Sequence, residues 1–342
     1  MFTKPVVLVV GAGASSELKL PLGSQLRNLI AGDVNLRFNH GRHESGSAEL
    51  MDALRRIVSS DHLSAMTQAG RRLSPTMIAQ PSVDEALFYF AGDADVVNLG
   101  KIAIANRILL AERGSELPAW DDYEGTRKFP AQNGQWLFLL FSLLVRGTRR
   151  AGERSFFENL TVINFNYDRT LEQYFFLALQ RNADLSREEA IAAMRGIRQL
   201  KPYGSLGPLD WQTDPGIPYG AAEAGHAAAA SSNIRTFTEQ FDNDQMRSEI
   251  ADSLGQAELI IFLGFGYHHQ NMEILQRPKK STVNQTALVL ATTLGLHEAN
   301  NDGIRRSISN WCRIDHSHVF LFQMSASGVL TELQPTILEK AG

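Results

Sequence analysis

Short apolar runs alternate with helical patterns along much of the chain. Residues 6–10 are five consecutive apolar residues, four of them valine, and they end at a glycine-rich turn. Mostly apolar runs recur at 160–165, 259–263, 287–290 and 319–322, with helical patterns between them. Such runs are typical of strands buried on both faces of a parallel sheet. We therefore expect an α/β fold with a doubly wound parallel sheet.

The segment between the first two strands has a different pattern. Residues 33–48 are rich in Asn, Gly, His, Ser and Arg and show little periodicity, so we expect a loop there. From about 49 to 150 the pattern is almost wholly helical, and Ser82 and Glu85 have the spacing of a capping box. We expect 33–155 to form a mainly helical insertion, while 1–32 and 156–342 together form the sheet domain.

Three further local expectations follow from the residue order. Ser24 precedes a helical apolar pattern and is the expected N-cap of that helix. Residues 186–198 have a mixed helical pattern. Residues 208–233 contain Pro, Gly and an Ala-rich tract, so we expect a long loop that is the best candidate for a lid.

Composition narrows the class of protein. The 342 residues carry a net charge of −4, which gives no support for direct binding to nucleic acid or to a membrane surface. The single cysteine, Cys312, excludes an intramolecular disulfide and a multi-cysteine zinc site, and it suits a reducing cytoplasm. The longest apolar stretch, 136–145, is well short of the roughly 20 residues of a membrane-spanning helix. We expect a cytoplasmic protein without a metal.

The turn after the first strand is the first candidate binding element. Residues 11–16 read Gly-Ala-Gly-Ala-Ser-Ser, a G-x-G-x-x-G pattern with serine at the third glycine. Such a turn after a buried strand favours nucleotide binding, although a tight turn without a ligand has the same signature. A second strand ending in an acidic residue about 20 residues later, as in dehydrogenases, is not evident.

Polar residues at other strand ends extend the candidate site. Asn166 follows the strand at 160–165, and its amide can contact a ribose hydroxyl or hold a water near an anomeric carbon. Asp168 is better explained as a helix cap. Tyr203 can serve in core packing, as a ribose contact or as a weak acid–base group. Thr292 can bind adenosine or simply end a strand.

Several segments, taken in order, resemble the sirtuin-like domains of bacterial proteins, many of which are NAD hydrolases of anti-phage defence. The matching segments are GAGAS, LPLGSQL, PSVDEAL, NFNYDRTLE, YGSL, IIFLGFGYHHQNMEIL and ATT. The resemblance implies a sirtuin-type Rossmann-like sheet that binds NAD as substrate. It implies that the pyrophosphate contacts Gly11, Ala12, Gly13 and Ser15, that Asn166 and Asp168 match the catalytic asparagine and the following aspartate, and that Gly264 and Gly266 match the turn near the adenosine ribose.

Departures from the family pattern shape the expected activity. One cysteine cannot supply the four-cysteine zinc site of sirtuin deacylases, and Phe165 stands where those enzymes have glutamine, so protein deacylation is not expected. Tyr203 stands where the family has its acid–base histidine, and a phenol is a poor base at neutral pH.

Two functions therefore stay open. The first is an NAD glycohydrolase that releases nicotinamide and ADP-ribose, gated by oligomerisation or by a partner such as a ring-forming ATPase. The alternative is a catalytically impaired module that binds NAD or ADP-ribose or acts as a scaffold. An NAD-dependent dehydrogenase ranks last, because no acid–base histidine is placed for hydride transfer.

Overall fold

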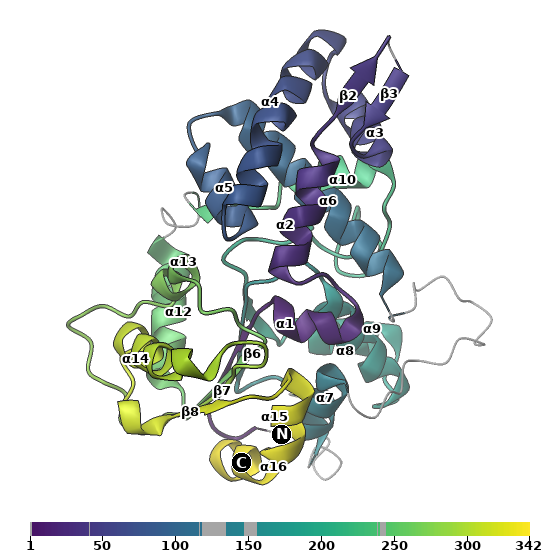
Figure 1. The fold of residues 1–342 in the computed structure, drawn as a ribbon. Helices are drawn as coiled ribbons and strands as arrows, with labels where there is room; N and C mark the ends of the chain where they lie inside the picture. The colour runs from purple at the N-terminus through teal and green to yellow at the C-terminus, as the bar shows by residue number, and fades with distance from the viewer. Residues whose placement is uncertain are drawn as a thin grey trace.

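The computed structural model describes residues 2–40, 42–115, 117, 135–146, 156–237, 239 and 244–342. It has an α/β fold built on a six-stranded parallel sheet with the order β5-β4-β1-β6-β7-β8 (Figure 1). The strands are β1 (Val6–Val10), β4 (Leu160–Asn164), β5 (Arg198–Leu200), β6 (Leu259–Leu263), β7 (Leu288–Thr292) and β8 (Val319–Phe322). The chain builds outward from β1 on one side and then on the other, so the predicted doubly wound sheet is confirmed.

Apolar side chains of β1 alternate between two cores, one on each face of the sheet. Val7 and Val9 pack with α12 (Asp244–Gln256), α13 (His269–Ile274) and α14 (Asn301–Cys312). Val6, Leu8 and Val10 pack on the opposite face. That face is covered by α7 (Trp136–Val145), α8 (Thr170–Arg181), α9 (Arg187–Met194), α15 (Ala326–Glu332) and α16 (Gln334–Ala341).

A group of helices lies beyond the carboxyl ends of the strands, in the upper part of Figure 1. Its members are α2 (Gly23–Asp33), α3 (Ala48–Ile57), α4 (Ser60–Ala79), α5 (Val83–Tyr89), α6 (Ala94–Gly114) and α10 (Ala224–Ser231). Helix α6 is apolar on more than one side, so it forms the centre of this group and packs against each of the other helices. We call this group the helical layer.

Two helices pack across the expected boundary between the sheet domain and the insertion. Helix α2, assigned to the sheet domain up to residue 32, packs on α4 and α6 of the helical layer. Helix α7, assigned to the insertion, packs on α8 and α15 beside the sheet. Residues 118–134 and 147–155 of the expected insertion lie outside the described residues. The boundaries at 33 and 155 stay a prediction.

Two expected loops contain regular structure. Residues 33–48 include an antiparallel hairpin of β2 (Arg37–Asn39) and β3 (Arg42–Ser45), whose side chains are mostly exposed and therefore lack an apolar signature. The expected lid at 208–233 contains α10, which buries Ala227 and Ala230 and packs on α3 and α6. Small alanine side chains allow this close packing of helices, so an Ala-rich tract here forms a fixed helix and not a free loop.

Two local assignments differ in outcome. The Ser82 side chain accepts the backbone N–H of Glu85 at the start of α5, which confirms the cap of that helix. Ser24 is not an N-cap, because α2 already begins at Gly23 and Leu22 occupies the cap position. The expected helix at 186–198 is shorter in the structure, where α9 ends at Met194, and Arg198 begins the short edge strand β5, which the sequence pattern does not predict.

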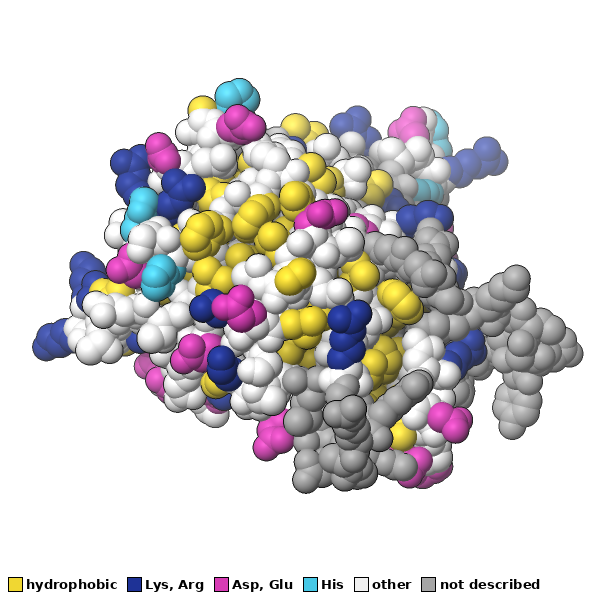
Figure 2. Space-filling model, turned by 90° about the horizontal axis from the view of Figure 1, so that it is seen from below, with side chains coloured by type: hydrophobic (Ala, Val, Ile, Leu, Met, Phe, Trp, Pro, Cys, Tyr) yellow, Lys and Arg dark blue, Asp and Glu magenta, His cyan; other side chains and the backbone are white. Residues whose placement is uncertain are grey.

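Among the described residues, no helix combines the length and apolar character needed to cross a membrane. Figure 2 views the molecule from below, on the side where the termini, α15 and α16 lie in Figure 1. Hydrophobic side chains gather in the middle of this face, with charged side chains around them. The helical layer and the turns that follow β1 and β6 lie at the opposite end of the molecule, at the carboxyl ends of the strands. The candidate functional residues belong to this end.

Candidate functional site

The turns after β1 and β6 are fastened to each other at the centre of the sheet edge. The Gly13 N–H donates to the Gly264 carbonyl oxygen at 2.9 Å, and the Gly11 N–H donates to Leu263 O at 3.0 Å. A Cβ at Gly264 would lie 1.9 Å from the Ala14 nitrogen, and Gly264 has φ +59°. Both the close approach and the left-handed backbone require glycine here. The two turns meet where the strand order reverses, which is the usual ligand-binding region of such sheets.

This contact limits how the glycine turn can hold a phosphate. Residues Ala12–Ser15 form only the single turn α1, and the Ala14 N–H donates to Gly11 O at 3.0 Å. Because the Gly13 N–H is bonded to Gly264, it can reach a phosphate only by exchanging that partner. The expected pyrophosphate contacts of Gly11, Ala12, Gly13 and Ser15 therefore stay a prediction.

Asn166 and Asp168, at the end of β4, meet Ser15 of the glycine turn. Asn166 Nδ2 donates to Ser15 Oγ at 2.9 Å, and Ser15 Oγ donates to Asp168 Oδ2 at 3.0 Å. The three side chains are 7%, 4% and 5% exposed, so this chain of hydrogen bonds is shielded from solvent. The structure thus brings Ser15 together with two side chains that lie 151 and 153 residues further along the chain.

The orientation of Asn166 leaves its carbonyl oxygen available. Its backbone N–H donates to Asn164 Oδ1 at 3.0 Å, and its Nδ2 is held by Ser15. No described residue donates a hydrogen bond to Asn166 Oδ1. The other carboxylate oxygen of Asp168, Oδ1, accepts the N–H of Thr170 at 3.1 Å, which closes an Asx turn before α8. Asp168 is not the expected N-cap itself, because Arg169 occupies that position.

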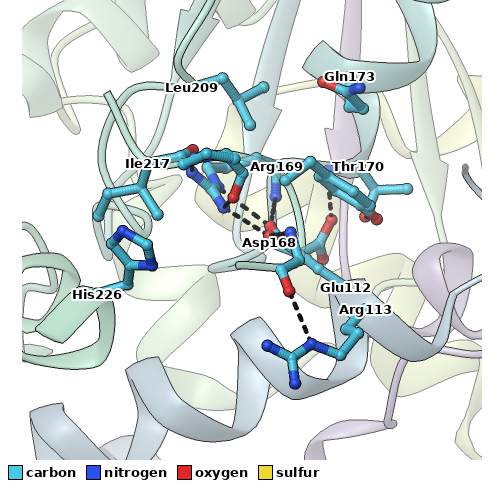
Figure 3. Close-up of polar contacts among 12 residues, drawn as sticks. Glu112, Arg113, Asp168, Arg169, Thr170, Gln173, Leu209, Ile217 and His226 are labelled. Carbon is cyan, nitrogen blue, oxygen red and sulfur yellow. Dashed lines mark hydrogen bonds and ion pairs between the residues drawn. The ribbon is translucent and has the colours of Figure 1, made fainter. Parts of the chain in front are cut away.

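Arg169 continues this segment and anchors the helical layer (Figure 3). Its guanidinium pairs with Glu112 of α6 at 2.6 Å, and the two side chains are 1% and 0% exposed. Arg169 also donates to the carbonyl oxygens of Ile217 and Pro218, while Glu112 accepts the Gly220 N–H. Every charge is matched, so the pair fixes α6 and the 217–220 segment against the end of β4.

Tyr203 lies in an aromatic cluster and not on open surface. Its ring packs at 6.0 Å from Phe165 and 6.2 Å from Tyr167, and Phe165 packs at 5.0 Å from Phe265 after β6. Its hydroxyl donates to Asn271 Oδ1 at 2.8 Å. Burial holds the pKa of Tyr203 well above its usual range. The phenol stays protonated at neutral pH, which does not favour a role as general base.

The remaining candidate residues are placed around the end of β6. The Gly264 N–H donates to Thr292 Oγ1 at 2.8 Å, and Tyr267 donates its hydroxyl proton to Thr292 O at 2.9 Å. Thr292 is 3% exposed, whereas Gly266 is exposed. Thr292 therefore supports the turn directly, and any contact of Thr292 or Gly266 with adenosine stays a prediction.

A cavity of about 880 Å³ opens beside the glycine turn. Ser16 and Lys19–Leu22 form one side of it and Arg107, Leu110 and Ala111 of α6 the other. Its volume is in the range of small-molecule sites. Asn166, Tyr203 and Gly264 do not line it. The cavity thus reaches the glycine turn only at Ser16, and Ser15, Asn166 and Asp168 are buried outside it.

The sequence pattern around Asp84 predicts a helix start and matches the PSVDEAL segment of the family, but it assigns Asp84 no role. In the structure Asp84 Oδ1, on α5, accepts a hydrogen bond from the Tyr167 hydroxyl at 2.6 Å. Burial raises the pKa of Asp84 from 3.8 to about 6. The available signal was the position of Asp84 within the PSVDEAL segment, but its contact with the end of β4 depends on tertiary packing.

The described residues contain no group of three or more His, Cys, Asp or Glu side chains arranged to hold a metal ion. Comparison with known proteins adds no family assignment: no protein-family model matches the chain, and no curated protein is significantly similar to it. The class of protein that the structure itself defines is a doubly wound α/β protein with a polar cluster at its strand ends.

Proposed function

We propose that this protein is a sirtuin-like NAD glycohydrolase, which cleaves the nicotinamide–ribose bond of NAD to give nicotinamide and ADP-ribose. The observation that carries the proposal is the fixed Asn166 side chain: Ser15 holds its Nδ2, and its Oδ1 is not used by any described residue. The amide thus presents a carbonyl oxygen beside the glycine turn. The resemblance of the ordered sequence segments to sirtuin-like domains supports the same reaction.

The arrangement suits the charge that develops in this reaction. Loss of nicotinamide builds positive charge on the ribose, and preorganised acceptors around it lower the barrier. Asn166 Oδ1 supplies a neutral acceptor, while the Asp168 carboxylate lies one hydroxyl away through Ser15. Fixed groups need no reorganisation during the reaction. Asn166 would orient the ribose or the attacking water, and Asp168 would hold Ser15 and Asn166 in place.

Burial of the site favours gating. Ser15, Asn166 and Asp168 are each at most 7% exposed, so NAD reaches them only after the residues that cover them move aside. We include in the proposal that oligomerisation or a partner, such as a ring-forming ATPase, drives this opening in an anti-phage response of the cytoplasm. A gated enzyme avoids loss of the cellular NAD pool at rest.

The second candidate function is an NAD- or ADP-ribose-binding module without turnover. The specific observation that favours it is Tyr203, which replaces the family histidine and uses its hydroxyl to bond Asn271. In this case the same residues would bind the dinucleotide, and the protein would serve as a sensor or a scaffold.

Nicotinamide release from NAD by the purified protein tests the proposal. We expect Asn166→Ala to lower the rate by about 10²–10³-fold, because one preorganised polar group has an effect of this size. Asn182→Ala, at the exposed end of α8, is the matched control and should keep the rate. An Asn166→Ala rate equal to that of the unaltered protein would remove the assigned role.

Thermal-shift measurements with NAD and ADP-ribose separate the two candidates. Binding raises the melting temperature whether or not the ligand is turned over. Stabilisation by both ligands without nicotinamide release, also in the presence of candidate partners, would favour the binding module. Gain of hydrolysis in Tyr203→His would favour it further.

A further inference from the structure

Asp84 is a carboxyl group with no cationic partner. The residue is partly exposed, and burial of its carboxyl group still raises its pKa. Among the described residues, no Lys, Arg or His side chain lies within 4.0 Å of it, and apart from its own backbone amide its polar partner is the Tyr167 hydroxyl at 2.6 Å. Its second oxygen, Oδ2, accepts no hydrogen bond from another described residue.

Three other shielded acidic groups of the helical layer and sheet edge are paired with cations. Glu112 pairs with Arg169, Asp33 of α2 pairs with Arg107, and Glu172 of α8 pairs with Lys201 at 2.7 Å. Enclosing a carboxylate without such a partner costs stability, so a protein keeps it where the charge has a function. Asp84 differs from these three residues in that respect. Asp168 also has no cationic partner, but its two oxygens accept hydrogen bonds from Ser15 and Thr170, whereas Asp84 Oδ2 accepts none from another described residue.

The position of Asp84 relates it to the candidate site. Tyr167, which it contacts, directly follows Asn166, and the Tyr167 ring packs beside Tyr203. Asp84 comes from α5 of the helical layer, while Ser15 and Asn166 belong to the strand ends. The carboxyl group therefore lies beside the Tyr167–Tyr203 pair, at the residue that follows Asn166.

The titratable groups that face Asp84 are few. They are Tyr167 and Tyr203 from the strand-end side and Glu85, its neighbour on α5. Helices α2, α4 and α6 pack against α5, and none of their described cationic side chains pairs with Asp84. Burial holds the phenolic pKa of both tyrosines far above neutrality, whereas the pKa of Asp84 is about 6, so neither phenol competes with Asp84 for a proton near neutral pH.

We propose that Asp84 is the general base of this site, the role that Tyr203 cannot fill. This inference rests on the proposed NAD hydrolysis. The C1′–N bond of NAD breaks, and nicotinamide leaves with the bonding electron pair. A water oxygen forms the new bond to C1′, and the proton of that water passes to Asp84 Oδ2 and then to solvent. Tyr167 holds the carboxyl group through Oδ1 and leaves Oδ2 to meet the water.

The acidity of the group fits this role. Burial raises the pKa of Asp84 to about 6, so the carboxylate predominates at pH 7 and still binds a proton better than an ordinary aspartate does. A base whose pKa lies just below the working pH accepts a proton and releases it again readily.

Steady-state rates of nicotinamide release between pH 4.5 and 8 test the role of Asp84. The test variant is Asp84→Asn, which can still accept the Tyr167 hydrogen bond but cannot bind the proton. We expect kcat to fall by about 10²–10⁴-fold at pH 7.5, since proton transfer by a positioned group contributes an effect of this size. KM should change little, and the rise in rate through pH 6 should be lost. Asp95→Asn, at the exposed start of α6, is the control and should keep both rate and pH profile.

The outcomes separate this inference from the proposed function. Full activity of Asp84→Asn with an unchanged pH profile, while Asn166→Ala is inactive, overturns the role of Asp84 alone. Absence of nicotinamide release from the unaltered protein overturns both. A lowered kcat counts as support only if Asp84→Asn melts at or above the temperature of the unaltered protein at pH 7.5, which excludes unfolding as the cause.

Discussion

Two carboxyl groups of the helical layer reach the same short segment after β4, in very different ways. Glu112 of α6 meets Arg169, a full counter-charge, and backbone donors complete its hydrogen bonds. Asp84 of α5 meets Tyr167, a neutral phenol. The first contact is matched in charge and suits an anchor. The second leaves a charge that is sensitive to pH and suits chemistry.

The difference shows how one segment serves several purposes. Residues 166–169 are consecutive, yet Asn166 and Asp168 turn to Ser15, Tyr167 to Asp84 and Arg169 to Glu112. The Glu112 pair fixes the helical layer over the strand end, and this fixed position sets where Asp84 can lie. The Glu112–Arg169 pair and the Asp84–Tyr167 contact thus belong to one interface, between the helical layer and the segment after β4.

Breaking the anchor should have the largest effect. Arg169→Met leaves the Glu112 carboxylate buried without a counter-charge, and we expect a loss of about 3–5 kcal/mol in the free energy of unfolding. Chemical denaturation measures it. Removing the exposed Arg113–Glu223 pair, whose atoms are 3.9 Å apart, should cost less than about 1 kcal/mol. Equal losses for the two pairs would contradict the contrast drawn here.

Neutralising Asp84, which contacts Tyr167, should raise the free energy of unfolding instead of lowering it. The folded-state pKa of Asp84 is about 6 and its ordinary value is 3.8, so the folded protein binds the proton more tightly than the unfolded chain does. Stability from this group is therefore full at low pH and falls as the pH rises from about 4 to 6. The rise in the pKa of Asp84 from 3.8 to about 6 corresponds to a loss of at most about 3 kcal/mol in the free energy of unfolding.

We therefore expect Asp84→Asn to be more stable than the unaltered protein above pH 6, with the difference vanishing below about pH 4. Melting curves of both proteins across this range measure the difference, and other titrating groups such as Asp33 cancel in it. A variant that is less stable at pH 7 would show that the Asp84 carboxylate is stabilising, and that the two contacts are alike.

Removing the phenol should have the smallest effect. Tyr167→Phe deletes one hydrogen bond to Asp84, and we expect a loss of about 1–2 kcal/mol in the free energy of unfolding. Tyr203→Phe, which deletes the bond to Asn271, is the matched control within the same aromatic cluster. If only Tyr167→Phe changes the pH profile of catalysis, the phenol acts on Asp84 and not on packing alone.

The central strands of the sheet could be predicted because they are buried on both faces, which gives β1, β4, β6 and β7 their apolar runs. The edge strand β8 is partly exposed but is also an apolar run. Strand β5 has only three residues and is half exposed, so it carries no such run. The exposed hairpin β2–β3 lacks alternation for the same reason.

Only those residues of the candidate site that follow strands could be predicted from the sequence. Gly13, Ser15, Asn166 and Gly264 follow strands, and parallel strands end at one edge, so their proximity follows from the fold class. Asp84 follows no strand. Its contact with Tyr167 depends on how α5 packs over the strand end, and the local sequence reports only the cap at Ser82.

The chain leaves the sheet after β1 and re-enters it at β4, the strand that is hydrogen-bonded to β1. Because departure and return are adjacent, the sheet needs nothing from most of the intervening residues to complete its own bonding. The segment between them can change in length and composition while Ser15 and Asn166 keep their places. Evolution or design can then alter the pH at which such a protein works by exchanging the helical layer while the strand ends stay the same.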